Sequence, residues 1–312
     1  MIIYNTRNWW QSLVLIARTF VSGKNYRHIL FGTLLSVIYA SLITYLDVYF
    51  LKADTFHIDP IFYSLIGFIL GLLLVFRLNT AYEKWWEGRK QWGTLINESR
   101  VLSTIFYALI PVTEKENRKY LAAQISNFSI ALKAHLQDDE LKLEDFECND
   151  EILLDILNTS NLPHKIASLI LAKTEELVQK FRISEFDKMN IKTQIQSLIH
   201  ILGSCERIKT TPIPFSHNSF IKSLILIYIG ALPFMLVEYF IYFTIPATAI
   251  LAYAMIGLEI ISDEIEQPFG KDNNDLPLNH LSAIIKKDVF EILQVSPDKT
   301  PYIQQVKSGI LT

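Results

Sequence analysis

The chain has 312 residues, of which 50% are hydrophobic and only 20% are charged, and its mean hydropathy is +0.25. This composition is too apolar for an ordinary soluble domain of that length and indicates a membrane protein. The net charge of -3 offers no basic surface for nucleic acid, and two cysteines without a CxxC pair predict neither a disulfide framework nor a zinc site.

The N-terminal segment precedes the first long apolar block. Its aromatic and apolar residues recur at helical spacing: Trp9, Trp10, Leu13, Ile16, Ala17 and Phe20. An amphipathic helix of this kind lies either in the membrane interface or on the protein's own surface, and the pattern leaves both open. The segment lacks the features of a secretory signal, so we expect it to be retained.

Four apolar stretches are long enough to cross a membrane, because a hydrocarbon core about 30 Å thick requires about 20 mostly apolar residues. They are His28–Leu46, Ile61–Phe76, Ser223–Val237 and Tyr239–Leu258. Glu238 alone separates the last two, which predicts a helical hairpin with a tight turn around residues 238–242. The expected regions are an interfacial segment 1–27, a membrane hairpin 28–78, a cytoplasmic helical region 79–218, a second hairpin 219–261 and a cytoplasmic segment 262–312.

Basic residues flank the spans on the side of the middle region: Arg18, Lys24, Arg27, Arg77, Lys84, Arg89, Lys90, Lys209 and Lys222. The loop of the first hairpin offers only Lys52. This asymmetry predicts a multi-pass protein of the cell membrane with both termini in the cytoplasm. In the middle region, apolar residues around 120–136, 166–181 and 191–202 recur at helical spacing and predict successive amphipathic helices.

Catalysis is not indicated by any motif. The seven histidines are scattered, and the chain contains no HExxH, GxSxG or GxGxxG pattern. A secondary transporter would usually show repeated halves and charges at mid-membrane depth, whereas the two hairpins are dissimilar and the four apolar stretches are free of such charges. We therefore expect neither an enzyme nor a transporter.

The second apolar stretch carries a stripe at four-residue spacing: Ile61, Leu65, Ile69 and Leu73. Gly67 and Gly71 form a GxxxG pair, which allows a neighbouring helix to approach closely. Such a stripe either lines a pore or simply faces lipid and other helices, and periodicity alone does not distinguish these.

Three motifs follow around the spans. RLNTAYEKWWEGRKQW occupies Arg77–Trp92, IPFS occupies Ile213–Ser216, and EQPFGKDNNDLPL occupies Glu266–Leu278. Prolines on both sides of Ile213 force an extended entry to the third span. In this order and spacing, over nearly the whole chain, the motifs resemble the bestrophin family in the form of its bacterial relatives.

The resemblance implies an all-α membrane protein in which five copies of the chain surround one central pore, each with four transmembrane helices and a cytoplasmic helical bundle. It also implies passive conduction of monovalent ions through a hydrophobic neck on the second span. Alignment by Arg77 places the neck at Ile61, Leu65 and Ile69, and a register one turn later places it at Leu65, Ile69 and Leu73. The family's second constriction falls on Ile213. Chloride and other monovalent anions are the first choice of ion, a cation channel is the alternative, and a non-conducting scaffold is the alternative from another class.

The resemblance also maps the family's calcium clasp onto four positions: Glu264, Gln267, Asp272 and Asp275. Here the sequence departs from the animal pattern, because Gln267 replaces an asparagine and Glu264 a glutamine, and Asn273 and Asn274 interrupt the acidic run. These departures argue against calcium gating. We therefore expect no resident cofactor, with calcium at this turn as the alternative.

Overall fold

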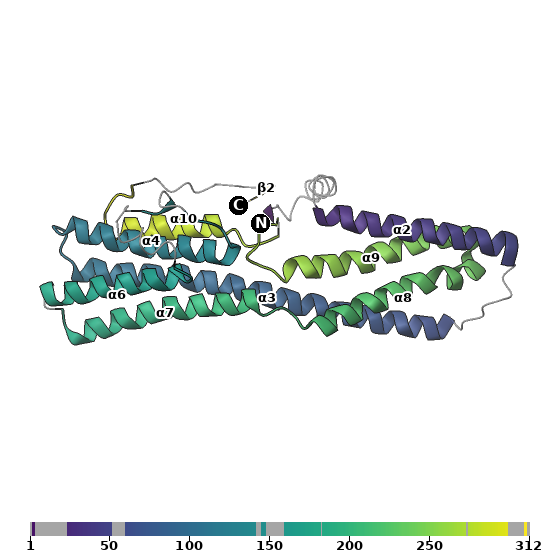
Figure 1. Cartoon of the computed structure of the whole chain (residues 1–312), viewed down its shortest axis with the longest axis horizontal. Helices are drawn as coiled ribbons and strands as arrows, with labels where there is room; N and C mark the ends of the chain where they lie inside the picture. Colours follow the sequence, from purple (N-terminus) through teal and green to yellow (C-terminus); the bar gives the residue numbers. More distant parts are fainter. Residues whose placement is uncertain are drawn as a thin grey trace. The chain divides into compact units, whose positions relative to one another are not determined.

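The computed structural model describes residues 2–3, 24–51, 60–141, 145–147, 159–181, 183–272, 274–298 and 309–310, and these are almost entirely helical (Figure 1). The helices are α2 (Lys24–Leu46), η1 (Asp47–Leu51), α3 (Pro60–Leu109), α4 (Lys115–Gln137), α6 (Leu162–Phe181), α7 (Glu185–Thr210), α8 (Phe215–Phe240), η3 (Ile241–Phe243), α9 (Thr244–Ile265) and α10 (Leu278–Ile292). Two short strands, β1 (Ile2–Ile3) and β2 (Gly309–Ile310), pair antiparallel. The expected helix at Trp9–Phe20, Lys52, Cys148 and Asn273 lie outside the described residues.

The chain divides into two compact units, and the division falls inside α3. The membrane unit comprises Tyr4–Trp85 and Pro212–Glu266, and the polar unit comprises Met1–Ile3, Trp86–Thr211 and Gln267–Thr312. Three helical stretches are long and apolar enough to cross a membrane, namely Asn25–Phe50, Ile61–Leu109 and Phe215–Ile265. The last of these contains two helices, α8 and α9, which are joined by the short 3₁₀ turn η3.

The turn between α8 and α9 lies where the sequence predicted it. Ile241, at the start of η3, has a positive φ of 48°, a conformation that a branched residue adopts only in a tight reversal. The four apolar stretches of the sequence thus correspond to α2, the first part of α3, α8 and α9. The all-α prediction is confirmed.

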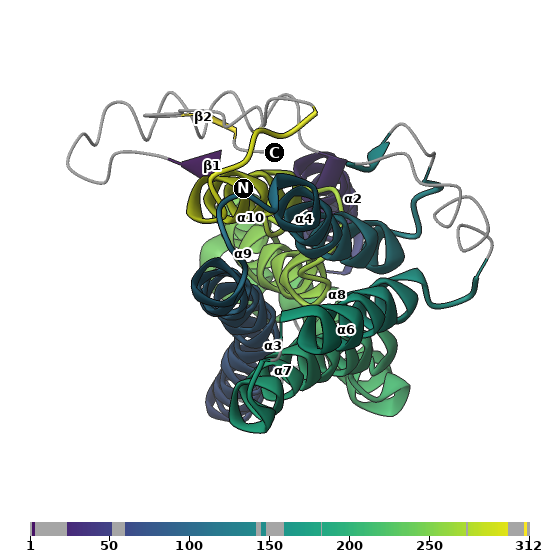
Figure 2. The same ribbon diagram turned by 90° about the vertical axis from the view of Figure 1, so that its left-hand side faces the viewer.

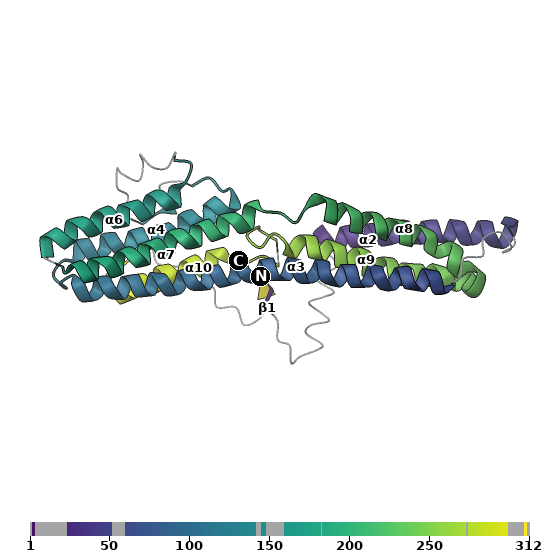
Figure 3. The ribbon, with the colours of Figure 1, turned by 90° about the horizontal axis from the view of Figure 1, so that it is seen from below.

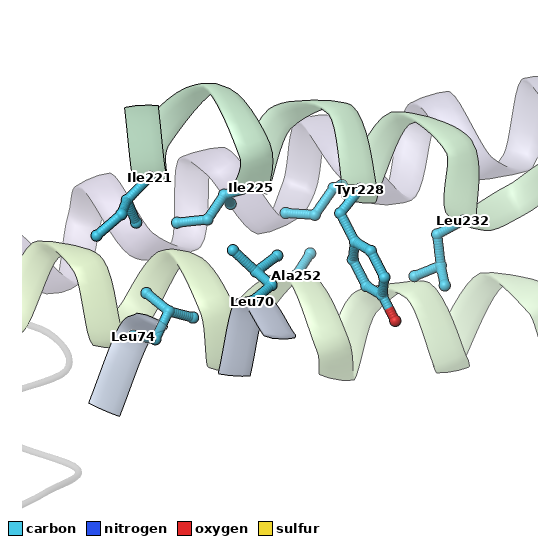
Figure 4. Packing of buried hydrophobic residues seen from close by; sticks show 8 residues of the cluster. Leu70, Leu74, Ile221, Ile225, Tyr228, Leu232 and Ala252 are labelled. Carbon is cyan, nitrogen blue, oxygen red and sulfur yellow. The ribbon is translucent and has the colours of Figure 1, made fainter. Parts of the chain in front are cut away.

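In the membrane unit, α2, α8 and α9 pack side by side (Figures 1 and 3). A buried cluster joins α3 to α8 and α9 (Figure 4). Its members are Leu70, Leu74, Ile221, Ile225, Tyr228, Ile229, Leu232 and Ala252. One face of α3 is therefore held against the other helices of the unit.

In the polar unit, α4 packs against α6 and α10, and α6 packs against α7 (Figure 2). The amphipathic helices predicted for residues 120–136, 166–181 and 191–202 are α4, α6 and α7. Their apolar positions, such as Phe128, Ile166 and Ile195, are buried together with Trp92 of α3. Burial of this apolar face drives the unit to fold.

Candidate functional site

The apolar stripe of α3 is divided between solvent-facing and packed positions. In the single chain, Ile61 is 78% exposed, Leu65 54% and Ile69 48%, whereas Leu73 packs against the buried cluster. The exposed stripe belongs to a wider uncovered apolar surface that includes Phe62, Phe68, Leu72 and Val75. So much apolar area on one helix requires lipid or further protein to cover it.

At Gly67, α3 packs against the side chain of Tyr228 on α8. A Cβ atom at this position would lie 2.5 Å from the Tyr228 hydroxyl oxygen, so a larger residue cannot be accommodated without movement. Tyr63 stacks on Tyr228 with ring centroids 4.4 Å apart, and its hydroxyl donates to the Tyr228 carbonyl oxygen at 2.5 Å. A Cβ atom at Gly71, the second glycine of the GxxxG pair, would meet no atom of another helix within 4 Å. Only the first glycine therefore has a packing role inside the described chain.

A group of six charged side chains ties α3, α8 and α9 together within the membrane unit. This charge cluster consists of Arg77, Lys84, Lys222, Glu259, Asp263 and Glu266. It contains equal numbers of cations and anions, so the charges balance locally. Balanced pairing is what permits charges to be buried at all, because an isolated buried ion is very costly.

Arg77 is the centre of the charge cluster and is fully buried. Its Nη2 lies 2.6 Å from Asp263 Oδ1 and 2.8 Å from Glu266 Oε2. The other oxygen of Asp263 accepts a hydrogen bond from Lys222 at 2.7 Å. Lys222 Nζ also lies 3.4 Å from Glu259, and Lys84 Nζ lies 4.0 Å from Glu266 Oε1. Each carboxylate of α9 therefore faces a cation from another helix.

Ile213 is attached to the same cluster through its backbone. Its N–H donates to Glu266 Oε1 at 2.8 Å, while Glu266 Oε2 holds Arg77. The side chain of Ile213 is half-buried, and Phe215 after it begins α8. The geometry thus brings the second predicted constriction residue to a carboxylate that also contacts α3.

The turn that follows α9 packs into the polar unit. A Cβ at Gly88 would lie 3.2 Å from both Pro268 and Phe269, so the small residue in the first motif makes room for the third motif. Gln137 Nε2 donates to the Gly270 carbonyl oxygen at 2.9 Å. The turn is therefore fastened to α3 and α4 by packing and by a backbone hydrogen bond.

The four predicted clasp residues are distributed between the units, with Glu264 in the membrane unit and Gln267, Asp272 and Asp275 in the polar unit. The Asp275 carboxylate is nearly buried, and its Oδ2 accepts the Asp272 N–H at 2.6 Å. Lys271, inside the same turn, forms an ion pair with Asp139. Among the described residues, no group of three or more His, Cys, Asp or Glu side chains could hold a metal ion.

The sequence predicted the stripe and Ile213 as site residues and did not predict the charge cluster. One signal was available, because Glu259, Asp263 and Glu266 follow one another at spacings of four and three and so share one face of a helix. Their partners could not be identified, since Arg77 is 186 residues from Asp263 in the sequence. Glu87, in the first motif, pairs locally with Lys90 at 2.6 Å and with Gln91 at 2.7 Å.

Comparison with known proteins agrees with this architecture. The sequence model of the family described as Bacterial/Fungal Bestrophin protein matches residues 1–291. A voltage-dependent anion channel-forming protein of Nostoc sp. is 30% identical over 309 residues, 94% of each chain. One of Synechocystis sp. is 35% identical over 236 residues, 73% of this chain and 76% of its own length.

Solved structures show the same fold. A bacterial bestrophin homolog from Klebsiella pneumoniae superimposes with a TM-score of 0.80 at 25% sequence identity, covering 86% of this chain and all of that one. The chain belongs to the bestrophin family, among its bacterial and fungal members.

Proposed function

We propose that the chain forms a passive, bestrophin-type channel for chloride and other monovalent anions. The observation that carries the proposal is the apolar stripe Ile61, Leu65 and Ile69 on α3, whose side chains are 48 to 78% exposed in the single chain. The names of the relatives as anion channel-forming proteins support the choice of anions. The protein is accordingly a membrane channel and not an enzyme.

The channel is a homopentamer in which α3 of each copy faces a common axis. One α3 helix encloses no pore, so conduction requires several copies, and the number five comes from the family. The wide apolar surface around Phe62, Phe68 and Leu72 supports contacts with other copies and with lipid. The distribution of basic residues supports insertion in the bacterial inner membrane with both termini and the polar unit in the cytoplasm.

The neck works by its apolar nature. A narrow ring of such side chains offers no ligand in place of the ion's water, so it blocks by dewetting when tight and passes partly hydrated ions when it widens. The packing of Leu73 against the buried cluster supports the register Ile61, Leu65 and Ile69. Ile213 forms a second constriction. Sign selectivity then comes from the charges around the pore.

Opening of the channel does not require calcium. Two features of the turn support this proposal: the Asp275 carboxylate accepts a backbone N–H, and Lys271 places an ammonium group in the turn. If so, a calcium chelator leaves the open probability of the purified channel unchanged. A clear loss of current on chelation, reversed by added calcium, would instead support a calcium site at this turn.

The reversal potential of the purified protein in planar bilayers under a potassium chloride gradient tests conduction and ion sign together. A value near the chloride equilibrium potential supports the anion channel. A value near the potassium potential supports a cation channel of the same architecture. No current from well-folded protein under varied calcium, pH and voltage would favour a non-conducting scaffold.

Alanine substitution tests the neck. Leu65→Ala and Ile69→Ala remove bulk from the proposed constriction, so single-channel conductance or open probability should rise. Leu226→Ala on α8 is a matched control, because Leu226 is 71% exposed and lies on another helix of the membrane unit. Equal effects of Leu65→Ala and Leu226→Ala on conductance and open probability would show that Leu65 does not line the pore.

A further inference from the structure

The segment that enters α8 has an unusual shortage of backbone donors. Pro212 and Pro214 lack an N–H group, so Ile213 supplies the single backbone donor of the Pro212–Ile213–Pro214 stretch. That donor is bound by the Glu266 carboxylate at 2.8 Å. The one backbone donor of this stretch is therefore held by a charge-assisted hydrogen bond, which is stronger than a bond between neutral groups.

Glu266 is also held from the other side. Its second oxygen accepts from Arg77 Nη2 at 2.8 Å, and its side chain is only 9% exposed. Arg77 lies on α3, eight residues after Ile69, which is about two helical turns further along the same helix. One carboxylate thus connects the helix that carries the proposed neck with the backbone of the proposed second constriction.

We propose that Glu266 is a positioning residue that couples the two constrictions, so that a displacement of α3 at Arg77 shifts Ile213. A buried carboxylate with a partner on each oxygen transmits movement, because losing either contact leaves a charge or a donor without its partner in a site poor in water. The part of this inference that concerns ion flow rests on the proposed channel function. The attachment of Ile213 through Glu266 does not.

Asp263 is the natural comparison. It lies one turn before Glu266 and also contacts Arg77 Nη2, at 2.6 Å. Its second oxygen binds Lys222, and the Ile213 N–H is bound by Glu266 instead. Removal of either carboxylate weakens the hold on Arg77, whereas only removal of Glu266 releases Ile213.

The attachment is tested by thiol labelling of Ile213→Cys in detergent-purified protein. Cys148→Ser removes one native thiol, and Cys205 can stay, because burial raises the pKa of its thiol to about 12 and keeps it unreactive. Adding Glu266→Ala should raise the labelling rate by a charged, water-soluble reagent about tenfold, the factor that a hydrogen bond to a charged group commonly represents. Adding Asp263→Ala should change the rate much less.

Equal labelling rates of Ile213→Cys in the Glu266→Ala and Asp263→Ala backgrounds would contradict the attachment of Ile213 through Glu266. Glu266→Gln guards against misfolding, because its amide oxygen can still accept the Ile213 N–H, so its labelling should be slower than that of Glu266→Ala. Faster labelling of the glutamine variant would count against the proposal. Size-exclusion profiles and melting temperatures verify that the variants are folded.

The coupling is tested electrically by combining Leu65→Ala and Ile213→Ala in planar bilayers. Coupled constrictions give non-additive effects on open probability, and the non-additivity should disappear in a Glu266→Ala background and persist in an Asp263→Ala background. Additive effects in the original background would contradict a coupling of the two constrictions through Glu266. The same non-additivity in the Glu266→Ala and Asp263→Ala backgrounds would contradict it as well. Absence of current in every variant would contradict the channel function and leave the labelling result to decide the attachment.

Discussion

Each unit contains an arginine that is almost completely buried, and the two are accommodated in different ways. Arg77 of the membrane unit, with no exposed surface, pairs with the carboxylates of Asp263 and Glu266. Arg118 of the polar unit is 2% exposed and donates to backbone carbonyl oxygens of Tyr107, Ile110 and Leu293 at 2.5 to 3.3 Å. Carboxylate charges balance Arg77, whereas the dipoles of backbone carbonyl groups balance Arg118.

The carbonyls around Arg118 come from two helix ends. α3 ends at Leu109 and α10 at Ile292, and the last carbonyls of a helix have no partner within it and carry partial negative charge. A planar guanidinium with five N–H groups can serve several of them at once. Arg118 therefore depends on the geometry of its partners, whereas Arg77 depends on their charge, and this difference can be measured.

The largest effect is expected for Arg77→Met. It removes the nearer of the two cations at the nearly buried carboxylate of Glu266 and leaves only Lys84, 4.0 Å away, and breaking a buried pair in this way costs about 3 to 5 kcal/mol. The melting temperature of the purified protein should fall strongly. Addition of Glu266→Gln should recover part of the loss, because the surviving charge is then removed.

Lys222→Met provides the comparison for Arg77, because Lys222 is 49% exposed, so water screens its contacts with Asp263 and with the nearly buried Glu259, and the loss should be smaller than for Arg77→Met. If Arg77→Met lowered the melting temperature no more than Lys222→Met, the burial of the pair between Arg77 and Glu266 would be without energetic consequence. Failure of Glu266→Gln to recover any stability would mean that shape, and not charge, sets the requirement at Arg77.

Arg118→Met should destabilise the polar unit by about 2 to 3 kcal/mol, because it leaves buried carbonyl oxygens without a donor. Arg118→Lys should recover little, since one ammonium group cannot reach the carbonyls of both helix ends. Thermal unfolding and limited proteolysis of the polar unit measure the change. Arg100→Met, which removes an ion pair to Asp288 from a side chain that is 47% exposed, is the matched control. Full rescue by lysine would show that charge alone is needed, as at Arg77.

Sequence reasoning succeeded where the pattern is long and local. Apolar periodicity predicted α4, α6 and α7, and the lone Glu238 predicted the turn near Ile241. It stopped the second span at Arg77, although α3 continues without a break to Leu109. Charged residues end an apolar surface, but they do not end a helix, since Arg, Glu and Lys are good helix formers.

The candidate site was predictable only in part. The stripe Ile61, Leu65 and Ile69 could be proposed because it recurs at four-residue spacing in an apolar stretch that leads into a recognisable motif at Arg77, and Ile213 because it lies within a motif. The carboxylates Asp263 and Glu266 could not be paired with Arg77, because their meeting depends on how α3 packs against α9.

A smaller effect is expected at the exposed pair of Asp138 and Lys209 in the polar unit. Asp138 follows α4 with a φ of 53°, and its Oδ1 accepts from Lys209 Nζ at 2.6 Å. Asparagine tolerates this left-handed conformation, so Asp138→Asn removes the charge and leaves the backbone unstrained. The melting temperature at pH 7 should fall slightly, because exposed pairs contribute little.

The pH dependence of that loss distinguishes charge from shape at this pair. The hydrogen bond from Lys209 holds the pKa of Asp138 below its ordinary value, so the folded state favours the carboxylate. The stabilisation is then complete above the pKa of the unfolded chain, about 3.9, and disappears as the pH falls through the lower folded pKa. The difference between the original chain and Asp138→Asn should therefore shrink towards zero in acid. In a Lys209→Met background it should be small at every pH. A difference that persists in acid would show that Asp138 acts there through its hydrogen-bond geometry, as Arg118 does, and not through its charge.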